Sequence, residues 1–279
     1  MTPDPGSVLE ELRRSGLALE HIGGNTGKLR LSLDLADSLR REGPALRVLD
    51  VGCAGPTPLN LWEPFVPLAG RLRLVGVDVA GLDRAERRAG ELGLAVELRE
   101  ASALTLRAAF GEGAFDAVVS TQVLEHLPSW PDALAEMASV LRPGGELFLT
   151  CDSGDRARPP VRRLQLSAKR LHARLRARAP MLARLTDRLV TGEWERGPTA
   201  AELRAAAGRA GLSIESLAHY ALSEVKDAER YAASATRQLW LAFEETLAAE
   251  TARPVAPGLY SILYLRARRP GDGSPGGDT

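Results

Sequence analysis

The sequence has little cysteine, few aromatic residues and no excess of charge of either sign. Two cysteines in 279 residues are too few for a disulfide framework, and Cys53 and Cys151 lack the spacing of a zinc site, so we expect free thiols and no metal. Because 36 Lys and Arg balance 36 Asp and Glu, a globally cationic nucleic-acid binder is excluded. No segment approaches the roughly 18 apolar residues of a membrane-spanning helix, and residues 1–5 lack the features of a secretory signal. The composition therefore predicts a cytoplasmic globular protein without an integral membrane segment.

Short apolar runs alternate with helix-length segments from residue 46 onward. Buried strands separated by helices predict a mainly parallel sheet with right-handed crossovers. The predicted strands span residues 45–51, 72–77, 95–98, 115–120, 146–150, 212–217 and 258–265.

Helical segments are predicted on either side of these strands. Residues 1–45 are expected to form a helical cap whose first helix begins with a capping box of Ser7 and Glu10, and whose second runs from about residue 28 to 41. Ser129 and Thr199 are predicted to cap two later helices, and a long helix is expected from about residue 223 to 250. The main domain is expected at 46–269, with a basic helical insertion at 152–198, a helical insertion at 221–256 and a disordered tail at 270–279.

A glycine-containing turn follows the first predicted strand. Residues 48–56 read Val-Leu-Asp-Val-Gly-Cys-Ala-Gly-Pro, and such a turn lets a ligand approach the backbone closely. The next strand ends in Asp78, whose carboxylate can accept hydrogen bonds from both hydroxyls of a ribose. In open α/β sheets ligands bind at the carboxyl ends of strands where strand order reverses. This pattern predicts a site for an adenosine-containing cofactor.

With these features the sequence resembles the class I S-adenosylmethionine-dependent methyltransferases of the small-molecule type. The resemblance is strongest over residues 46–150. Its motifs are the glycine turn, Asp78, Phe-Asp-Ala-Val-Val-Ser-Thr-Gln-Val-Leu-Glu-His-Leu at 115–127 and Leu-Arg-Pro-Gly-Gly at 141–145. It implies an α/β fold with a Rossmann-like, doubly wound, seven-stranded sheet, mostly parallel with an antiparallel last strand, plus helical insertions. It also implies S-adenosylmethionine as cofactor, S-adenosylhomocysteine as product and a small-molecule acceptor.

The resemblance also implies a set of cofactor-binding residues. Two positions depart from the family pattern, because Ala54 and Pro56 stand where the family has glycine. Near the position of Ser102 the family commonly has an aspartate that accepts a hydrogen bond from the adenine amino group. Ser102 can also accept this hydrogen bond, but more weakly than an aspartate. The residues expected to contact the cofactor are Asp50, Gly52, Cys53, Gly55, Asp78, Ser102 and Gln122.

His126 is the candidate catalytic residue. It follows the fourth predicted strand, and an imidazole that titrates near neutrality can take a proton from a hydroxyl or amine acceptor. The alternative is an architectural role, in which the histidine packs on the next helix. The candidate substrate-binding residues are Trp194, Arg196, His219 and Tyr220.

Residues 156–188 carry eleven basic side chains and one acid. Apolar residues at helical spacing within this segment predict an amphipathic cationic helix. Three roles stay open: a solvated outer face, a lid over an anionic acceptor, or a surface that meets membrane phosphates or RNA. The position after the fifth strand favours the lid.

Three other functions compete with small-molecule methylation. An RNA methyltransferase is disfavoured by the low aromatic content and by the lack of an appended RNA-binding domain, so a nucleic-acid partner is not expected. The altered glycine turn keeps open a non-catalytic cofactor-binding or scaffold protein. A nicotinamide-dependent oxidoreductase is disfavoured because no Gly-x-Gly-x-x-Gly motif is present. Finally, 33 arginines against 3 lysines indicate a high-GC bacterial genome and suit a biosynthetic pathway.

Overall fold

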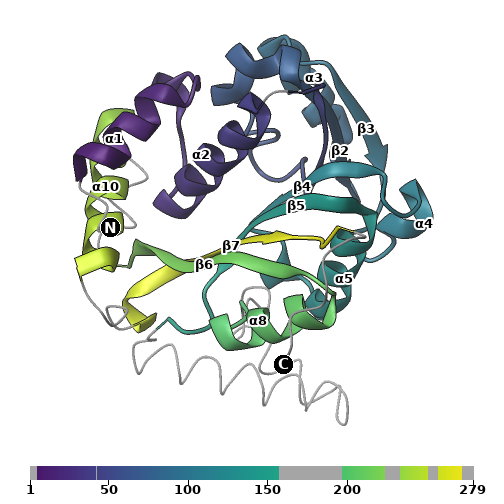
Figure 1. The fold of residues 1–279 in the computed structure, drawn as a ribbon. Helices are drawn as coiled ribbons and strands as arrows, with labels where there is room; N and C mark the ends of the chain where they lie inside the picture. Colours follow the sequence, from purple (N-terminus) through teal and green to yellow (C-terminus); the bar gives the residue numbers. More distant parts are fainter. Residues whose placement is uncertain (1–4, 42, 157–196, 224–232, 251–256, 272–279) are drawn as a thin grey trace, which may run out of the picture.

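The computed structural model describes residues 5–41, 43–156, 197–223, 233–250 and 257–271, and these form a twisted sheet with helices on both faces (Figure 1). Within the described residues, seven strands pair in the order β3-β2-β1-β4-β5-β7-β6. The strands are β1 (Leu46–Val51), β2 (Leu72–Asp78), β3 (Val96–Glu100), β4 (Phe115–Thr121), β5 (Leu141–Asp152), β6 (Ser213–Leu222) and β7 (Tyr260–Arg268).

The strand directions confirm the expected mixed sheet. β1 pairs in parallel with β2 and β4, and β2 with β3 and β4 with β5 pair in the same way. β7 runs antiparallel to both of its neighbours, β5 and β6. β5 begins five residues earlier than predicted, because Leu141 pairs with Phe115 beyond an irregularity in the ladder. Strand order reverses between β1 and β4, which is where a binding crevice is expected.

Alternating side chains of the parallel strands enter two separate hydrophobic clusters. Val48 of β1 faces one cluster and the adjacent Leu49 faces the other, as expected for a sheet covered on both faces. α1, α2, α3, α10 and η2 contribute to the first cluster, and α4, α5 and α8 to the second. The helices are α1 (Pro5–Arg14), η1 (Leu19–His21), α2 (Thr26–Arg40), η2 (Glu63–Arg71), α3 (Leu82–Leu92), α4 (Leu106–Phe110), η3 (Leu124–His126), α5 (Trp130–Val140), α8 (Ala200–Arg209), α10 (Ser234–Glu250) and η5 (Pro257–Leu259).

Helix starts agree with the sequence prediction in part. Thr199 caps α8 as predicted, and Glu202 completes a capping box with it. The box predicted at Ser7 is wrong, because α1 begins at Pro5 and Ser7 lies within the helix. Ser129 precedes α5 but its side chain makes no capping hydrogen bond. α2 begins before the predicted residue 28, because the Asn25 side chain accepts the Lys28 backbone N–H at 2.9 Å.

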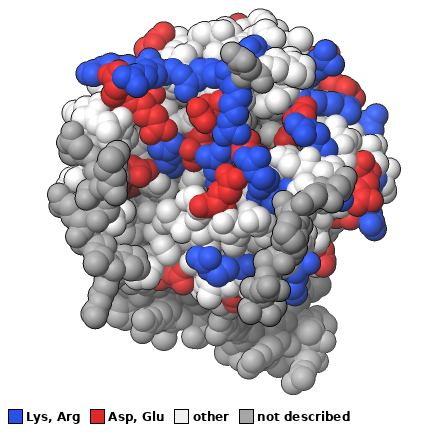
Figure 2. Space-filling view, in the orientation of Figure 1, with Lys and Arg blue, Asp and Glu red and all other residues white. Residues whose placement is uncertain are grey.

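Several predicted segments lie outside the described residues. These include most of the basic insertion, the tail from residue 272 and the junction at 224–232, so the predictions for them stand as predictions. Within the described ranges, none of the helices is both long and apolar enough to cross a bilayer. On the face shown in Figure 2, the basic and acidic side chains of the described residues are interspersed instead of gathered by sign.

Candidate functional site

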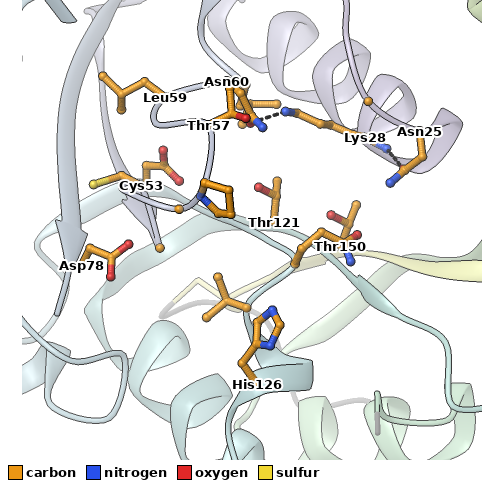
Figure 3. A pocket seen from close by; sticks show the side chains of 18 of the residues that line it. Asn25, Lys28, Cys53, Thr57, Leu59, Asn60, Asp78, Thr121, His126 and Thr150 are labelled. Atoms are coloured by element: carbon orange, nitrogen blue, oxygen red, sulfur yellow. Dashed lines mark hydrogen bonds between the residues drawn. The ribbon is translucent and has the colours of Figure 1, made fainter. Parts of the chain in front are cut away.

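A cavity of about 580 Å³ opens at the carboxyl ends of the parallel strands, beside the reversal of strand order (Figure 3). Lys28 and Asn60 lie on one side of it, His126 on the opposite side and Asp78 at one end. The residues that the sequence analysis assigned to the site and that line this cavity are Asp50, Gly52, Cys53, Gly55, Asp78, Gln122 and His126.

The turn after β1 depends on Gly52. Its φ is +85°, a conformation that L residues rarely adopt, and a Cβ there would collide with the Val123 side chain. The backbone N–H groups of Gly52 and Cys53 both donate to the Val77 carbonyl, at 2.8 and 3.2 Å. Gly55 differs, because a Cβ at that position would meet nothing within 4 Å. The turn is therefore held against β2 with open space beside it.

Asp78 joins the end of β2 to the same turn. One carboxylate oxygen accepts the Ala54 N–H at 2.9 Å and the other accepts the Val79 N–H at 2.8 Å. Asp78 lines the cavity, and each oxygen keeps acceptor capacity after its backbone hydrogen bond. The carboxylate can therefore hold the turn and accept hydrogen bonds from a diol at the same time.

Asp50 is buried at the end of β1, with 5% of its surface exposed. Its carboxylate accepts the indole N–H of Trp62 at 2.7 Å. Burial raises the pKa of Asp50 to about 6, whereas the Trp62 hydrogen bond and the charge of Lys28 act to lower it. The Trp62 partner was not found from the sequence, because nothing in a local pattern indicates which buried acid an indole will reach.

Lys28 was also missed as a site residue. It lies in the first turn of α2, is 8% exposed and donates from Nζ to the Asn60 side chain. Burial lowers the pKa of Lys28 to about 8, while the nearby Asp50 carboxylate acts to raise it. A weak signal was present, because Lys28 is the only lysine before residue 169 and follows a helix cap.

The buried Asp50 carboxyl predicts a pH-dependent stability. A carboxyl whose pKa is higher in the folded than in the unfolded state binds more protons when folded, so its contribution is complete below about pH 4 and is lost as pH rises through about 6. We expect the stability of the ligand-free protein, relative to Asp50→Asn, to fall by on the order of 3 kcal/mol across that window. Urea unfolding of both proteins from pH 4 to 7 measures this. Asp83→Asn on the exposed face of α3 is the control, and parallel curves for wild type and Asp50→Asn would contradict the prediction.

His126 ends η3, the short helix that follows β4. Its backbone N–H donates to the Val123 carbonyl at 3.0 Å, and its exposed side chain lines the cavity across from Lys28 (Figure 3). Gln122, immediately after β4, has a φ of +58°. The segment that follows β4 therefore supplies two polar side chains to the lining of the cavity.

The other predicted site residues lie elsewhere. Ser102 is not among the residues that line the cavity, and its hydroxyl accepts the Leu104 N–H at 3.2 Å. His219 and Tyr220 in β6 are also outside the lining; His219 Nε2 lies 3.0 Å from Asp155 Oδ2, and Tyr220 donates to Glu245. Two further candidates, Trp194 and Arg196, are outside the described residues. Among those that are described, no group of three or more His, Cys, Asp or Glu side chains is placed to hold a metal ion.

Comparison with known proteins finds relatives of the part of the chain that forms β1 to β5. Residues 49–149 match the family model described as a methyltransferase domain. A ubiquinone biosynthesis O-methyltransferase of Xanthomonas axonopodis pv. citri is 36% identical over 113 residues, which is 40% of this chain and 46% of that protein. The protein of the same name from Burkholderia thailandensis is 33% identical over 107 residues, 38% of this chain and 44% of that one. The matched region thus spans less than half of these relatives.

Solved structures resemble the chain over most of its length. Phosphoethanolamine N-methyltransferase 2 of Haemonchus contortus has a TM-score of 0.54 at 16% identity, covering 85% of this chain and 52% of that one. Geranyl diphosphate methyltransferase has a TM-score of 0.53 at 17% identity, with 95% and 90% covered. The [4+2]-cyclase SpnF has a TM-score of 0.50 at 19% identity, with 88% and 81% covered. At these identities the likeness concerns the fold, which alone does not determine the chemistry. Residues 49–149 thus match a methyltransferase domain, and the fold of the chain and its glycine turn agree with that match.

Proposed function

We propose that this chain transfers a methyl group from S-adenosylmethionine to a small-molecule acceptor. The observation that carries the proposal is one cavity that joins Asp78, the Gly52 turn, Lys28 and His126. When bound, the cofactor supplies a methyl group already activated by its sulfonium. The protein therefore has to bind the cofactor, orient the acceptor, exclude water and receive a proton.

The polar residues of the cavity suit a nucleoside that carries an amino-acid tail. Asp78 at the end of β2 would accept hydrogen bonds from the ribose hydroxyls, and the open space around Gly55 leaves room beside the backbone. Lys28, on the other side of the turn, would bind the carboxylate of the amino-acid part by a charge-assisted hydrogen bond. Asn60 would hold the ammonium group of Lys28 in place. In this proposal Asp78 binds the ribose of the cofactor and Lys28 binds the carboxylate of its amino-acid part.

His126 is proposed to act as the base for a protic acceptor. It faces the cavity from η3, on the opposite side from Lys28. The names of the curated relatives favour oxygen as the methylated atom, and a hydroxyl acceptor must release a proton on methylation. We further propose that the acceptor is anionic and that the reaction serves a bacterial biosynthetic pathway. Residues 156–188 are proposed to contact either this acceptor or membrane phosphates.

Two measurements test the proposal. Calorimetry should show binding of S-adenosylmethionine and S-adenosylhomocysteine to the purified protein. Incubation of cell extract with the protein and cofactor labelled in the methyl group should transfer the label to a small molecule, identified by mass spectrometry.

Absence of cofactor binding would refute the cofactor assignment. Binding without any labelled product would favour a non-catalytic protein or different chemistry on this fold, for which the cyclase neighbour is a precedent. Label in RNA instead would favour the RNA methyltransferase alternative.

The role of Lys28 gives a prediction of its own. Replacing Lys28 by methionine keeps the length of the side chain and removes its charge, so binding of S-adenosylhomocysteine should weaken by roughly 10- to 100-fold, the value of a charged hydrogen bond. Adenosine, which has no amino-acid tail, should bind wild type and variant equally. Calorimetry with both ligands measures this, and an equal loss for adenosine would assign Lys28 to the structure of the site instead.

A further inference from the structure

A group of polar side chains joins the ends of β4 and β5 at the wall of the cavity. Gln122 Nε2 donates to Glu125 Oε1 at 2.6 Å and to Asp152 Oδ1 at 2.9 Å. The backbone N–H of Gln122 donates to the Thr150 carbonyl at 2.8 Å. Gln122 and Thr150 line the cavity, whereas Glu125 and Asp152 are not part of the lining. Both hydrogens of the Gln122 amide are therefore directed away from a ligand, toward two carboxylates.

These two hydrogen bonds determine which way the amide of Gln122 points. If the amide were reversed, its oxygen would face two carboxylate oxygens, which cannot donate when ionised. Burial raises the pKa of Glu125 to about 7, with the Asp152 charge acting in the same direction, so Glu125 is mostly ionised at pH 8. At that pH the amide oxygen of Gln122 stays directed to the opposite side and can only accept.

Three buried oxygens in this group have no hydrogen-bond partner within the described part of the chain. They are Gln122 Oε1, Glu125 Oε2 and Thr150 Oγ1. Thr150 is 1% exposed and Glu125 4% exposed, so these are buried polar atoms. A buried acceptor without a partner loses the hydrogen bonds it would make to water, and a bound donor would restore one of them.

The backbone of Gln122 adds a second cost. Its φ of +58° is uncommon for a residue with a side chain, and such a conformation is less stable than the usual ones. Glycine would remove that cost but would supply no amide. Strained residues of this kind cluster at functional sites, and here the strain accompanies an acceptor oxygen at a cavity wall.

We infer that Gln122 Oε1 and Thr150 Oγ1 form a two-point subsite for a hydrogen-bond-donating group of the acceptor, a hydroxyl or an amine. Glu125 and Asp152 are positioning residues, which act by holding the amide of Gln122. This inference rests on the proposed function, because it assigns the acceptor to the β4–β5 side of the cavity and leaves Asp78 and Lys28 for the cofactor. It changes the role expected for the Gln122 side chain from cofactor contact to acceptor recognition.

The test compares small probes that differ in one donor group. Phenol and aniline are each compared with toluene, and benzyl alcohol is compared with ethylbenzene. NMR titration of the full chain at pH 8 measures the affinity for each probe, with and without saturating S-adenosylhomocysteine. Wild type should bind the donor member of each pair about tenfold more tightly. Thr150→Val and Gln122→Met should each reduce that preference to below about threefold. Thr246→Val, which removes a hydroxyl bonded within α10, should leave it unchanged.

The Tm of the Thr150→Val variant distinguishes a binding role of Thr150 from a purely structural one. Thr150→Val replaces an unpartnered buried hydroxyl by a methyl group of the same shape, so its Tm should equal or exceed that of wild type while the donor preference is lost. A preference retained in both variants, or no preference in wild type, would overturn the subsite. Failure to bind S-adenosylhomocysteine would instead count against the proposed function, and the titration without it still decides the subsite.

Discussion

Replacing His126 by asparagine is expected to lower turnover by about 10²- to 10⁴-fold while leaving the affinity for S-adenosylhomocysteine nearly unchanged. The imidazole lines the cavity from η3, and asparagine keeps a polar side chain there but cannot accept a proton near neutral pH. Turnover would be measured on the acceptor identified by label transfer, and affinity by calorimetry.

His21→Asn is the matched control, because His21 lies in η1 outside the cavity lining and 3.3 Å from Glu63. It should keep wild-type turnover. If His126→Asn also turns over at the wild-type rate, His126 has the architectural role that the sequence left open. If it loses turnover together with cofactor affinity or Tm, the loss reflects the shape of the site and the base must be sought elsewhere.

Replacing Asp78 by alanine is expected to weaken cofactor binding by roughly 10- to 100-fold, which corresponds to the loss of about 1.5 to 3 kcal/mol of charge-assisted hydrogen bonding. The same carboxylate accepts the backbone N–H groups of Ala54 and Val79, so alanine also loosens the turn after β1. Calorimetry with S-adenosylhomocysteine measures the combined loss.

Asp78→Asn separates the two contributions. Its amide oxygen can still accept from Ala54, but it lacks the charge and the second acceptor for a ribose diol. We expect an intermediate loss of affinity with little change in Tm, whereas Asp83→Ala on the exposed face of α3 should change neither. Wild-type affinity in Asp78→Ala would exclude the ribose contact and leave Asp78 only its hydrogen bonds to the backbone.

Much of the sheet could be predicted because its determinants are local. Strands buried on both faces need continuous apolar runs, and residues 46–51, 72–78 and 115–121 show them directly. β5 was predicted to begin at residue 146, and its regular pairing with β4 and β7 does begin at Glu146; the structure adds Leu141, which pairs with Phe115 across the irregularity that contains Pro143, Gly144 and Gly145. The turn residues therefore keep their local preference, and of the residues before Glu146 only Leu141 pairs with β4.

Local pattern likewise determined the part of the site that follows single strands. Gly52 is required by a backbone conformation, and Asp78 occupies the end of a strand, so each could be placed from its neighbours in the sequence. The tertiary structure decided which side chains meet them. Lys28 reaches Asn60 from α2, Trp62 reaches Asp50, and Gln122 reaches Asp152 only because β5 lies beside β4. Hydrogen bonds between side chains far apart in the sequence depend on strand order, helix placement and rotamer together, and none of these is encoded in a local periodicity.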